Sequence, residues 1–225
     1  LHICRVRVCG HQSGARESAY PTIAECCEEM SRAGKGRAGS GQLRIIGGQW
    51  RGRKLRFHAA PGLRPTADRV RETLFNWLAA DIDGARCLDL FAGSGALGLE
   101  ALSRGADHCD FVDSASRSLD DIAGHLASLG ATARASCHPV PARRFLAGHA
   151  GPWDIVFLDP PFGEALLGSA VAALSGLLDE GALVYVETGQ RESLPALPPH
   201  WAPHRDKTAG DVRYRLFVVG PRQTV

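Results

Sequence analysis

The fold is decided by the stretch Cys87-Leu88-Asp89-Leu90-Phe91-Ala92-Gly93-Ser94-Gly95-Ala96-Leu97-Gly98-Leu99-Glu100-Ala101. An apolar strand runs into a glycine turn, and apolar residues then recur at helical spacing. Gly93 and Gly95 permit positive φ and a close backbone approach, while the start of the following helix points N–H groups at a ligand. The stretch therefore predicts a nucleotide-type binding turn between a strand and a helix.

Two cofactors fit such a turn. Gly93-x-Gly95-x-x-Gly98 matches the dinucleotide fingerprint, and Asp113 ends the next strand, where a ribose-binding acid belongs. A nicotinamide-dependent dehydrogenase is thus one alternative. However, Asp89 is placed to approach a cationic amino acid moiety, and the acidic turn at Asp159 has no role in hydride transfer. These two features favour S-adenosylmethionine.

Strand and helix patterns alternate along the rest of the chain, which predicts a mostly parallel, doubly wound α/β sheet of seven strands. The last two strands are separated only by Ala209-Gly210-Asp211, so they should form an antiparallel hairpin. After the glycine turn, the predicted strands are 110–113, 133–137, 154–159, 182–187, 204–207 and 213–219, and the predicted helices are 116–129, 142–148 and 165–178.

The tetrapeptide Asp159-Pro160-Pro161-Phe162 closes the apolar run 153–158. The two prolines fix φ and disfavour helix, so the chain leaves its strand in a stiff extended turn. The Asp159 carboxylate and the Pro160 carbonyl can each accept one N–H of an exocyclic amine, while Phe162 stacks on the base. The turn predicts substitution at an amine nitrogen, although a proline-rich turn can also simply end a buried strand.

Positive charge is concentrated near one end of the chain. Residues 43–71 carry eight basic residues and one acid, whereas residues 72–225 carry 12 basic and 19 acidic residues. Such a block predicts a phosphate-binding surface, and the alternative is a solvated basic hairpin. The residues expected to contact RNA phosphates here are Arg51, Arg53, Lys54, Arg64, Arg69 and Arg71.

The basic block should fold as a hairpin followed by a helix. Residues 43–46 and 54–57 read as short strands around the turn 47–52, in which Trp50 either stacks on a base or anchors the turn. Thr66-Ala67-Asp68 can cap a helix that ends at Leu78 and places Arg69, Arg71 and Asn76 near the cofactor.

The predicted organisation has four parts. Residues 1–42 are a disordered extension or a misassigned start, 43–80 an RNA-binding hairpin and helix, 81–220 the methyltransferase domain, and 221–225 a tail. No apolar run approaches the ~20 residues of a membrane span. The seven cysteines show neither a disulfide framework nor zinc-site spacing. We expect a cytoplasmic monomer without a metal.

Residues 43–219 resemble the bacterial family that methylates N2 of a guanine in 16S rRNA. Three segments are specific to that family: Arg44-Ile45-Ile46-Gly47-Gly48-Gln49-Trp50-Arg51-Gly52-Arg53-Lys54, Gly62-Leu63-Arg64-Pro65-Thr66 and Asp68-Arg69-Val70-Arg71-Glu72-Thr73-Leu74-Phe75-Asn76-Trp77-Leu78. The tail also matches, through His204-Arg205-Asp206-Lys207-Thr208-Ala209-Gly210 and Tyr214-Arg215-Leu216. The segments Phe91-Ala92-Gly93-Ser94-Gly95 and Asp159-Pro160-Pro161-Phe162 are shared more widely, including with enzymes that act on adenine in DNA.

The resemblance implies a Rossmann-like class I methyltransferase fold, S-adenosylmethionine as cofactor, and the assembling or assembled small ribosomal subunit as partner. It implies guanine 966 as the target. It also implies that Asp89, Phe91, Gly93 and Gly95 line the cofactor pocket, that Asp113 binds the ribose, that the backbone at Ala142 recognises adenine, and that Asp159, Pro160, Pro161 and Phe162 hold the guanine.

Two positions depart from the family pattern. Ala115 stands where a second acid is usual, and Pro141 stands where a polar residue often lies beside the adenine. We therefore expect altered affinity for the cofactor but not its loss. A DNA amino-methyltransferase acting on adenine N6, and a non-catalytic protein that binds RNA or a nicotinamide cofactor, remain as alternatives.

Overall fold

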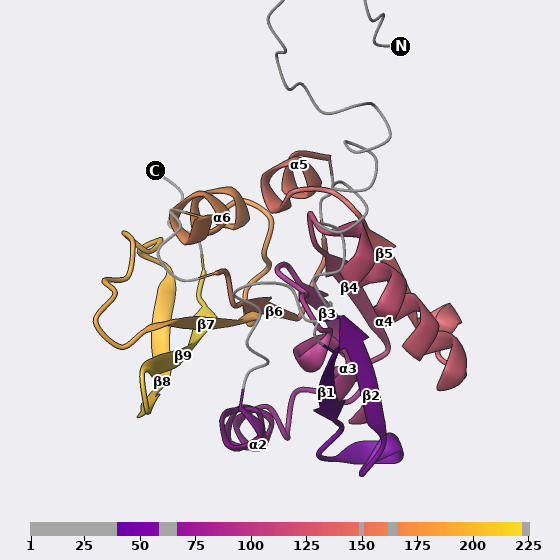
Figure 1. The fold of residues 1–225 in the computed structure, drawn as a ribbon. Coiled ribbons are helices and arrows are strands. Elements are labelled where there is room, and N and C mark those ends of the chain that lie inside the picture. Colours follow the sequence, from indigo (N-terminus) through magenta and orange to yellow (C-terminus); the bar gives the residue numbers. More distant parts are fainter. Residues whose placement is uncertain (1–39, 59–66, 149–150, 162–165, 222–225) are drawn as a thin grey trace, which may run out of the picture. The chain divides into compact units, whose positions relative to one another are not determined.

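The protein is described by a computed structural model that covers residues 40–58, 67–148, 151–161 and 166–221. Within these ranges, a seven-stranded sheet has the order β5-β4-β3-β6-β7-β9-β8, and a separate two-stranded sheet pairs β1 with β2 (Figure 1). The strands are β1 (Ser40–Arg44), β2 (Lys54–His58), β3 (Arg86–Asp89), β4 (His108–Val112), β5 (Ala135–His138), β6 (Ile155–Leu158), β7 (Leu183–Gly189), β8 (Trp201–Ala209) and β9 (Val212–Val219). The α-helices are α2 (Asp68–Trp77), α3 (Ala96–Ser103), α4 (Ser116–Ser128), α5 (Ala142–Gly148) and α6 (Leu166–Leu174), with 3₁₀ turns η1 (Gly48–Trp50) and η2 (Thr132–Arg134).

The predicted sheet architecture is confirmed. Strands β3 to β7 run parallel, and β9 pairs antiparallel with both β7 and β8. The chain builds β3, β4 and β5 outward in one direction and then returns to place β6 on the other side of β3. Open α/β sheets bind ligands at such a switch point, beyond the carboxyl ends of the strands. Here those ends belong to β3 and β6.

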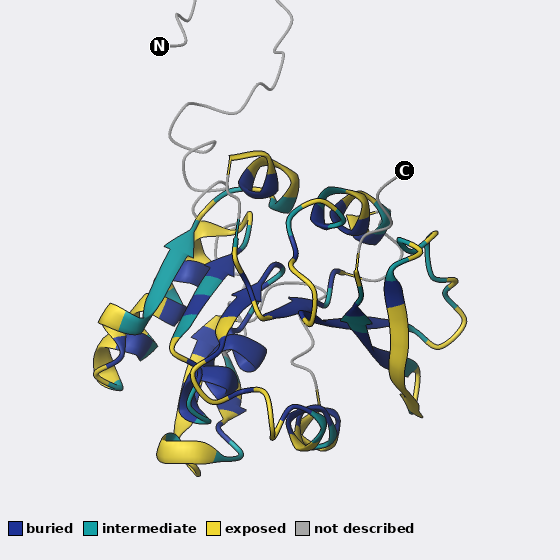
Figure 2. Ribbon diagram, turned by 180° about the vertical axis from the view of Figure 1, so that it is seen from behind, coloured by how far each residue is buried: buried dark blue, intermediate teal, exposed yellow. Residues whose placement is uncertain are grey.

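Helices cover both faces of the sheet. One face packs against α2, α3, α4 and the β1–β2 hairpin, and the other packs against α5 and α6 (Figure 1). All four residues of β6 are buried, as expected for a central parallel strand that is covered on both sides. Figure 2 shows this burial at the centre of the sheet, in contrast to the exposed strand β8.

The basic segment forms the predicted hairpin, with one difference at its start. β1 begins at Ser40, which pairs with His58, whereas the sequence predicted a strand from Leu43. Along β2, Leu55 and Phe57 point inward and the intervening basic side chains point outward. This period of two gives the hairpin one apolar face, which packs on the core, and one charged face.

Helix α2 connects the hairpin with the last strands of the sheet. The ring of Phe75 lies 6.0 Å from that of Phe157 in β6, and Trp77 stacks on Tyr214 of β9 with the centroids 5.3 Å apart. Full burial of a side chain such as that of Phe75 contributes about 2 kcal/mol. The N-cap residue is Ala67, without a side-chain capping bond, and Thr66 lies outside the described residues.

Strand and helix ends differ from the predicted ones mainly at β8 and α6. β8 runs from Trp201 to Ala209, because all but one of its residues pair with β9 although few are apolar. α6 ends at Leu174, where Ser175-Gly176 follow. None of the helices in the described ranges combines the length and hydropathy required to span a membrane.

Candidate cofactor and base-binding site

The glycine turn lies between β3 and α3, and its glycines are required by the geometry. Gly93 and Gly95 have φ values of 49° and 76°, in the region that side-chain-bearing residues rarely adopt. A Cβ atom at Gly98 would collide with the ring of Phe111 and with Sγ of Cys109. The third glycine therefore lets α3 pack directly against β4, while the first two shape the turn.

Asp89 ends β3 and is almost fully buried beneath this turn. One of its carboxylate oxygens accepts a hydrogen bond from the backbone N–H of Gly98 at 3.0 Å. Burial, together with the nearby carboxylates of Asp159 and Asp113, raises the pKa of Asp89 to about 7, against the effect of the Gly98 bond. A cationic ligand at this carboxyl would favour its ionised form.

Asp113 braces the glycine turn from the end of β4. Its two carboxylate oxygens accept hydrogen bonds from the backbone N–H groups of Gly93 and Ala115, each at 2.8 Å. Each oxygen has a second lone pair that remains for a ligand hydroxyl. Ala115 thus contributes its backbone N–H here, and the role of Asp113 in ribose binding stays a prediction.

An apolar surface lies next to the turn. Phe91 and Ala142 are half-buried and pack against the same hydrophobic cluster as Val140. The carbonyl of Pro141 accepts the N–H groups of Arg144 and Phe145, so it is used in starting α5. Because proline has no N–H, Pro141 offers no donor to an adenine ring. A flat base at this surface would rest chiefly on apolar contacts.

The Asp-Pro-Pro turn follows β6 directly, at the same edge of the sheet as Asp89. Asp159 is half-buried, Pro160 is buried and Pro161 is exposed. Because β3 pairs in parallel with β6 and Asp89 lies opposite Phe157, Asp159 comes only two residues beyond the position opposite Asp89. Phe162, predicted to stack on the base, lies outside the described residues.

Glu187 is a member of this site that the sequence interpretation missed. It directly follows Val186, the last residue of β7 that pairs with β6, and 5% of its surface is exposed. Since Leu158 pairs with Val186, Glu187 lies next to Asp159 in cross-strand register. The hydroxyl of Tyr185 donates a hydrogen bond to its carboxylate at 2.7 Å. Burial and the charge of Asp159 together raise the pKa of Glu187 to about 8, against the effect of the Tyr185 hydrogen bond.

A signal for Glu187 was present in the sequence. It follows the apolar run Ala182-Leu183-Val184-Tyr185-Val186, as Asp89, Asp113 and Asp159 follow theirs. An acid at the carboxyl end of a parallel strand lies at the ligand edge of the sheet, and this rule extends to Glu187.

The prediction that Arg71 contacts RNA is wrong. Its side chain is 1% exposed, and its guanidinium donates to Asp68 at 2.6 Å and to the carbonyl of Arg44 at 2.9 Å. Arg71 occupies the apolar face of α2 with Leu74, Phe75 and Leu78, at a spacing of three, four and seven residues. Its charge is therefore used inside the protein.

Arg71 belongs to a buried network centred on Glu100 of α3. The Glu100 carboxylate accepts the backbone N–H groups of Ile46 and Gly47, each at 2.8 Å, and the Nε–H of Arg104 at 2.7 Å. Nη1 of Arg71 lies 3.6 Å from the same carboxylate. The network fastens the hairpin to the helix that starts at the glycine turn.

The remaining predicted RNA contacts that can be described are exposed: Arg51, Arg53 and Lys54 on the hairpin and Arg69 on α2. Arg64 lies outside the described residues. Trp50 is only partly buried, packs against the core and lies under the guanidinium of Arg134, 5.8 Å from its ring centroid. The structure therefore favours the anchoring role of Trp50 over base stacking.

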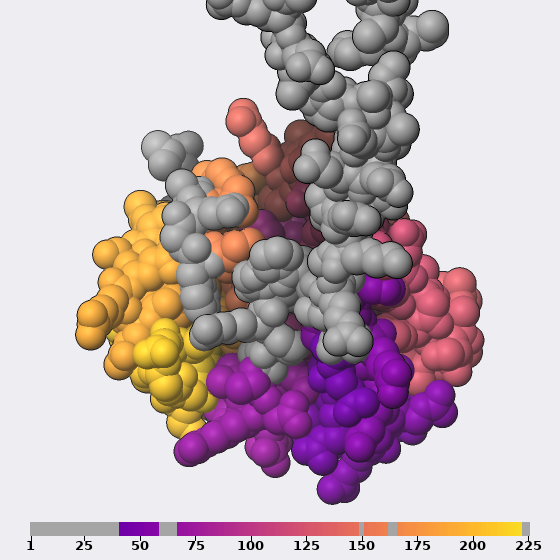
Figure 3. Space-filling view, in the orientation of Figure 1, coloured from indigo at the N-terminus to yellow at the C-terminus, as the bar shows by residue number. Residues whose placement is uncertain are grey.

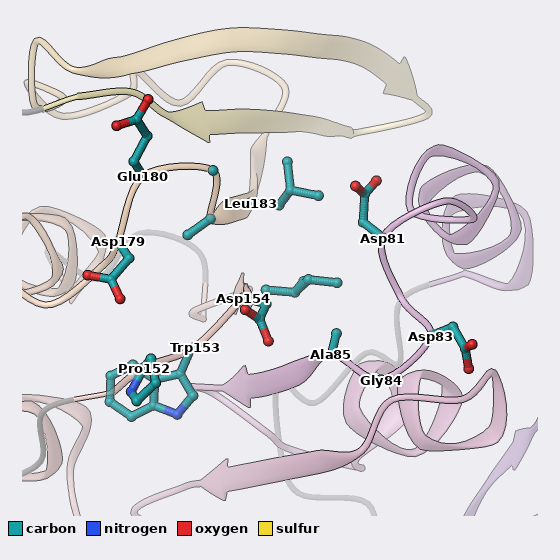
Figure 4. A pocket seen from close by; sticks show the side chains of 13 residues that line it. Asp81, Asp83, Gly84, Ala85, Pro152, Trp153, Asp154, Asp179, Glu180 and Leu183 are labelled. Carbon is teal, nitrogen blue, oxygen red and sulfur yellow. The ribbon is translucent and has the colours of Figure 1, made fainter.

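A cavity of about 450 Å³ lies at the opposite edge of the sheet, where β3, β6 and β7 begin (Figure 4). Its charged lining is entirely acidic: Asp81, Asp83, Asp154, Asp179 and Glu180. The Asp154 carboxylate accepts the backbone N–H of Arg86 at 2.7 Å, which is a structural role. An acidic cavity repels phosphates, so the carboxyl edge remains the candidate site. Within the described ranges, no cluster of His, Cys, Asp or Glu could hold a metal ion.

Comparison with known proteins gives the family. Residues 43–218 match the family model described as "Conserved hypothetical protein 95". The chain belongs to this family. Members of similar sequence are named ribosomal RNA small subunit methyltransferase D: the protein from Escherichia coli is 52% identical over 80% of this chain and 91% of its own length, and that from Haemophilus influenzae is 42% identical over 79% and 94%.

Solved structures agree with the family assignment. A putative methyltransferase from Escherichia coli shares 48% identity, covers 80% of this chain and 99% of its own, and has a TM-score of 0.74. An RNA methyltransferase from Salinibacter ruber, solved with S-adenosyl-L-homocysteine, has a TM-score of 0.55 at 13% identity, which speaks for the fold alone. The predicted family, Rossmann-like methyltransferase fold and S-adenosylmethionine cofactor are confirmed.

Proposed function

We propose that the protein transfers a methyl group from S-adenosylmethionine to N2 of a guanine in 16S rRNA, with guanine 966 as the target that the resemblance implies. The observation that carries the proposal is the placing of the Asp159-Pro160 turn at the same sheet edge as Asp89 and the glycine turn. A turn that binds the target amine beside a turn that binds the cofactor would bring the methyl acceptor and the methyl donor together. The relatives' names support rRNA as the substrate.

The residues at this edge fit the cofactor chemically. The Asp89 carboxyl is buried and, among the described residues, has no cation within 4.0 Å, so the positively charged amino acid moiety of the cofactor would complement it. Gly93 and Gly95 allow the backbone to approach, and Phe91 with Ala142 offers an apolar surface to the adenine. When bound, the cofactor supplies an electrophilic methyl group on a sulfonium.

Asp159 and Pro160 prepare the base for attack. The lone pair of the guanine amine is delocalised into the ring, so this nitrogen is a poor nucleophile. Acceptors that bind both N–H bonds favour the pyramidal nitrogen of the transition state more than the planar ground state. We assign one acceptor to the Asp159 carboxylate and one to the Pro160 carbonyl, with Pro161 flanking the base.

Orientation supplies the second contribution. Holding the amine nitrogen in line with the methyl group converts a bimolecular encounter into a near-unimolecular step. A proton leaves the nitrogen after transfer, and neither a metal nor a covalent nucleophile is needed. The guanine must leave its stack to reach the turn, which suits a loop nucleotide. Arg51, Arg53, Lys54, Arg64 and Arg69 would bind the surrounding phosphates.

The test is methyl transfer from labelled S-adenosylmethionine to three substrates: unmodified small ribosomal subunits, naked 16S rRNA and DNA. Nucleoside analysis of the product identifies the base and the atom. N2-methylguanosine from rRNA or from subunits is the expected product, and the faster of these two substrates shows whether the particle or the free RNA is recognised. Labelled N6-methyladenine from DNA, with unlabelled RNA, would contradict the proposal.

A further inference from the structure

The last hairpin of the sheet carries a sequence motif to which the proposed reaction gives no role. Residues 204–210 belong to β8 and the following turn, and β8 is an edge strand that pairs only with β9. From Ala202 to Thr208 every residue of β8 is exposed, on both faces of the strand (Figure 2). Residues 202–208 are therefore not buried under any of the described helices.

Register assigns two basic side chains of β8 to a definite face. Lys207 lies opposite Tyr214, and Arg205 lies opposite Leu216. Directly opposed residues of an antiparallel pair share a face of the sheet. Tyr214 stacks on Trp77 of α2, so Arg205 and Lys207 lie on the face that α2 covers.

The hairpin also reaches the ligand edge of the sheet. Gly189, the last residue of β7, pairs with Val212, the first residue of β9. The turn 209–211 therefore lies beside the carboxyl end of β7, and β7 is the neighbour of β6, the strand that Asp159 follows. Arg205 and Lys207 thus lie on the face that α2 covers, and Lys207 lies level with Glu187, because both residues pair with Tyr214.

The charge of the hairpin contrasts with the domain around it. Residues 72–200 carry seven basic and 17 acidic residues, whereas residues 201–219 carry four basic and two acidic ones. Asp206 is bound to Arg213 at 2.6 Å and lies 3.6 Å from Arg215. Among the described residues, neither Arg205 nor Lys207 has a carboxylate within 4.0 Å. Their charges remain available to an external anion.

Helix α2 lies between this basic strand and the β1–β2 hairpin. Arg71 of α2 donates to the carbonyl of Arg44 in β1, and Trp77 of α2 stacks on Tyr214 in β9. Figure 3 shows α2 with the indigo hairpin on one side and the yellow C-terminal strands on the other. Two basic surfaces therefore flank the same helix on one face of the protein.

We propose that Arg205 and Lys207 form a second RNA-binding surface, which contacts the phosphate backbone of the substrate rRNA on the side of α2 opposite the β1–β2 hairpin. This inference rests on the proposed function. Exposed cationic side chains on two arms bind a polyanion without reading its sequence, and they position the flipped base between them. A single hairpin would fix only one side of the target.

The test uses the full-length protein and the double variant Arg205→Gln/Lys207→Gln, which keeps polar side chains on the edge strand. Its affinity for 16S rRNA transcript and for small subunits is measured from 50 to 200 mM salt. The matched control is Arg143→Gln/Arg144→Gln, which removes the same charge from exposed positions on α5, on the other face of the sheet. Affinity for S-adenosylmethionine is measured in parallel.

We expect the double variant to bind RNA roughly tenfold more weakly, with a salt slope smaller by about 1.8 for duplex contacts. Its affinity for the cofactor and its turnover at saturating RNA should match wild type, and the control should behave as wild type. Wild-type affinity and slope in the double variant would overturn the inference. So would wild-type RNA binding accompanied by self-association, because the charges would then only protect an exposed edge.

Failure of the proposed function has a different signature. If the wild-type protein methylates rRNA and the double variant binds RNA as tightly as wild type, the RNA-binding role of β8 is wrong but the proposed reaction stands. If wild-type protein itself neither binds nor methylates rRNA, both fall.

Discussion

Replacing Glu187 with Gln should flatten the pH dependence of folding stability. Burial beside Asp159 raises the pKa of Glu187 to about 8 in the folded protein, from an ordinary value of 4.5. Because the folded-state pKa is raised, this group contributes stability that is fully present below pH 4.5 and is lost as the pH rises through 8. The carboxyl is almost fully buried, so solvent screening does not reduce the effect.

The magnitude follows from proton linkage. With these two pKa values, the contribution of Glu187 to the free energy of unfolding falls by roughly 2–3 kcal/mol between pH 6 and pH 9. Gln has no proton to lose, so the wild-type curve should fall by that much more than the variant curve. Asp89 titrates in both proteins and cancels in the difference.

Urea unfolding at half-unit steps of pH measures both curves. Glu180→Gln, at an exposed position, is the control and should run parallel to wild type. Tyr185→Phe removes a hydrogen bond that favours the ionised carboxyl, so it should raise the pKa of Glu187 and move the loss of stability to higher pH. Parallel curves for wild type and Glu187→Gln would refute the assignment of a buried, protonated carboxyl at this position.

Three further predictions concern the site and its supports. Asp89→Asn should weaken S-adenosylmethionine binding roughly tenfold or more, since a hydrogen bond to a charged group contributes about 1.5–3 kcal/mol. The affinity of the wild-type protein should fall as the pH drops below about 7, whereas that of the variant should not change with pH. Calorimetry measures both affinities, and the same pH dependence in the two proteins would exclude Asp89 as its source. Replacing Arg51, Arg53 and Lys54 together with Gln should reduce the salt slope of RNA binding by about 2.7 for duplex contacts or about 2.1 for single strands, and an unchanged slope would leave the hairpin with a structural role only. Arg71→Ala should cost about 3 kcal/mol of stability in urea unfolding, because it removes a partner from the buried carboxylate of Glu100. The salt slope of RNA binding should stay unchanged. A stable variant with a reduced salt slope would show that Arg71 contacts RNA after all.

The fold could be predicted from the sequence because several local sequence signals agreed. Glycines at 93, 95 and 98 combine two positive φ values with one close helix–strand contact, as a nucleotide-type binding turn requires. The alternation of apolar strands and helices then determined a parallel sheet, and the short turn at 209–211 determined the antiparallel end. β8 was underestimated because an exposed edge strand lacks the apolar alternation by which strands are recognised.

The sequence predicted the site residues that follow the apolar runs of the strands, because the carboxyl ends of parallel strands form the ligand edge of the sheet. Asp89, Asp113 and Asp159 follow that rule, and Glu187 follows it as well, although it was overlooked because no motif surrounds it. Arg71 was assigned to RNA binding because of its charge alone. Its position on the buried, apolar face of α2 was not taken into account. The partners that make its burial tolerable, Glu100 above all, are distant in sequence, and a single sequence does not connect them.

The most direct test of the central claim is single-turnover methyl transfer to unmodified small subunits by wild type and by Asp159→Ala, with nucleoside analysis of the RNA and a parallel measurement of cofactor affinity. The account predicts N2-methylguanosine from the wild-type protein, a loss of most turnover in the variant, and nearly equal affinity of both for S-adenosylmethionine. Equal rates of methyl transfer in the two proteins would contradict it, because the Asp159 carboxylate would then have no part in the reaction.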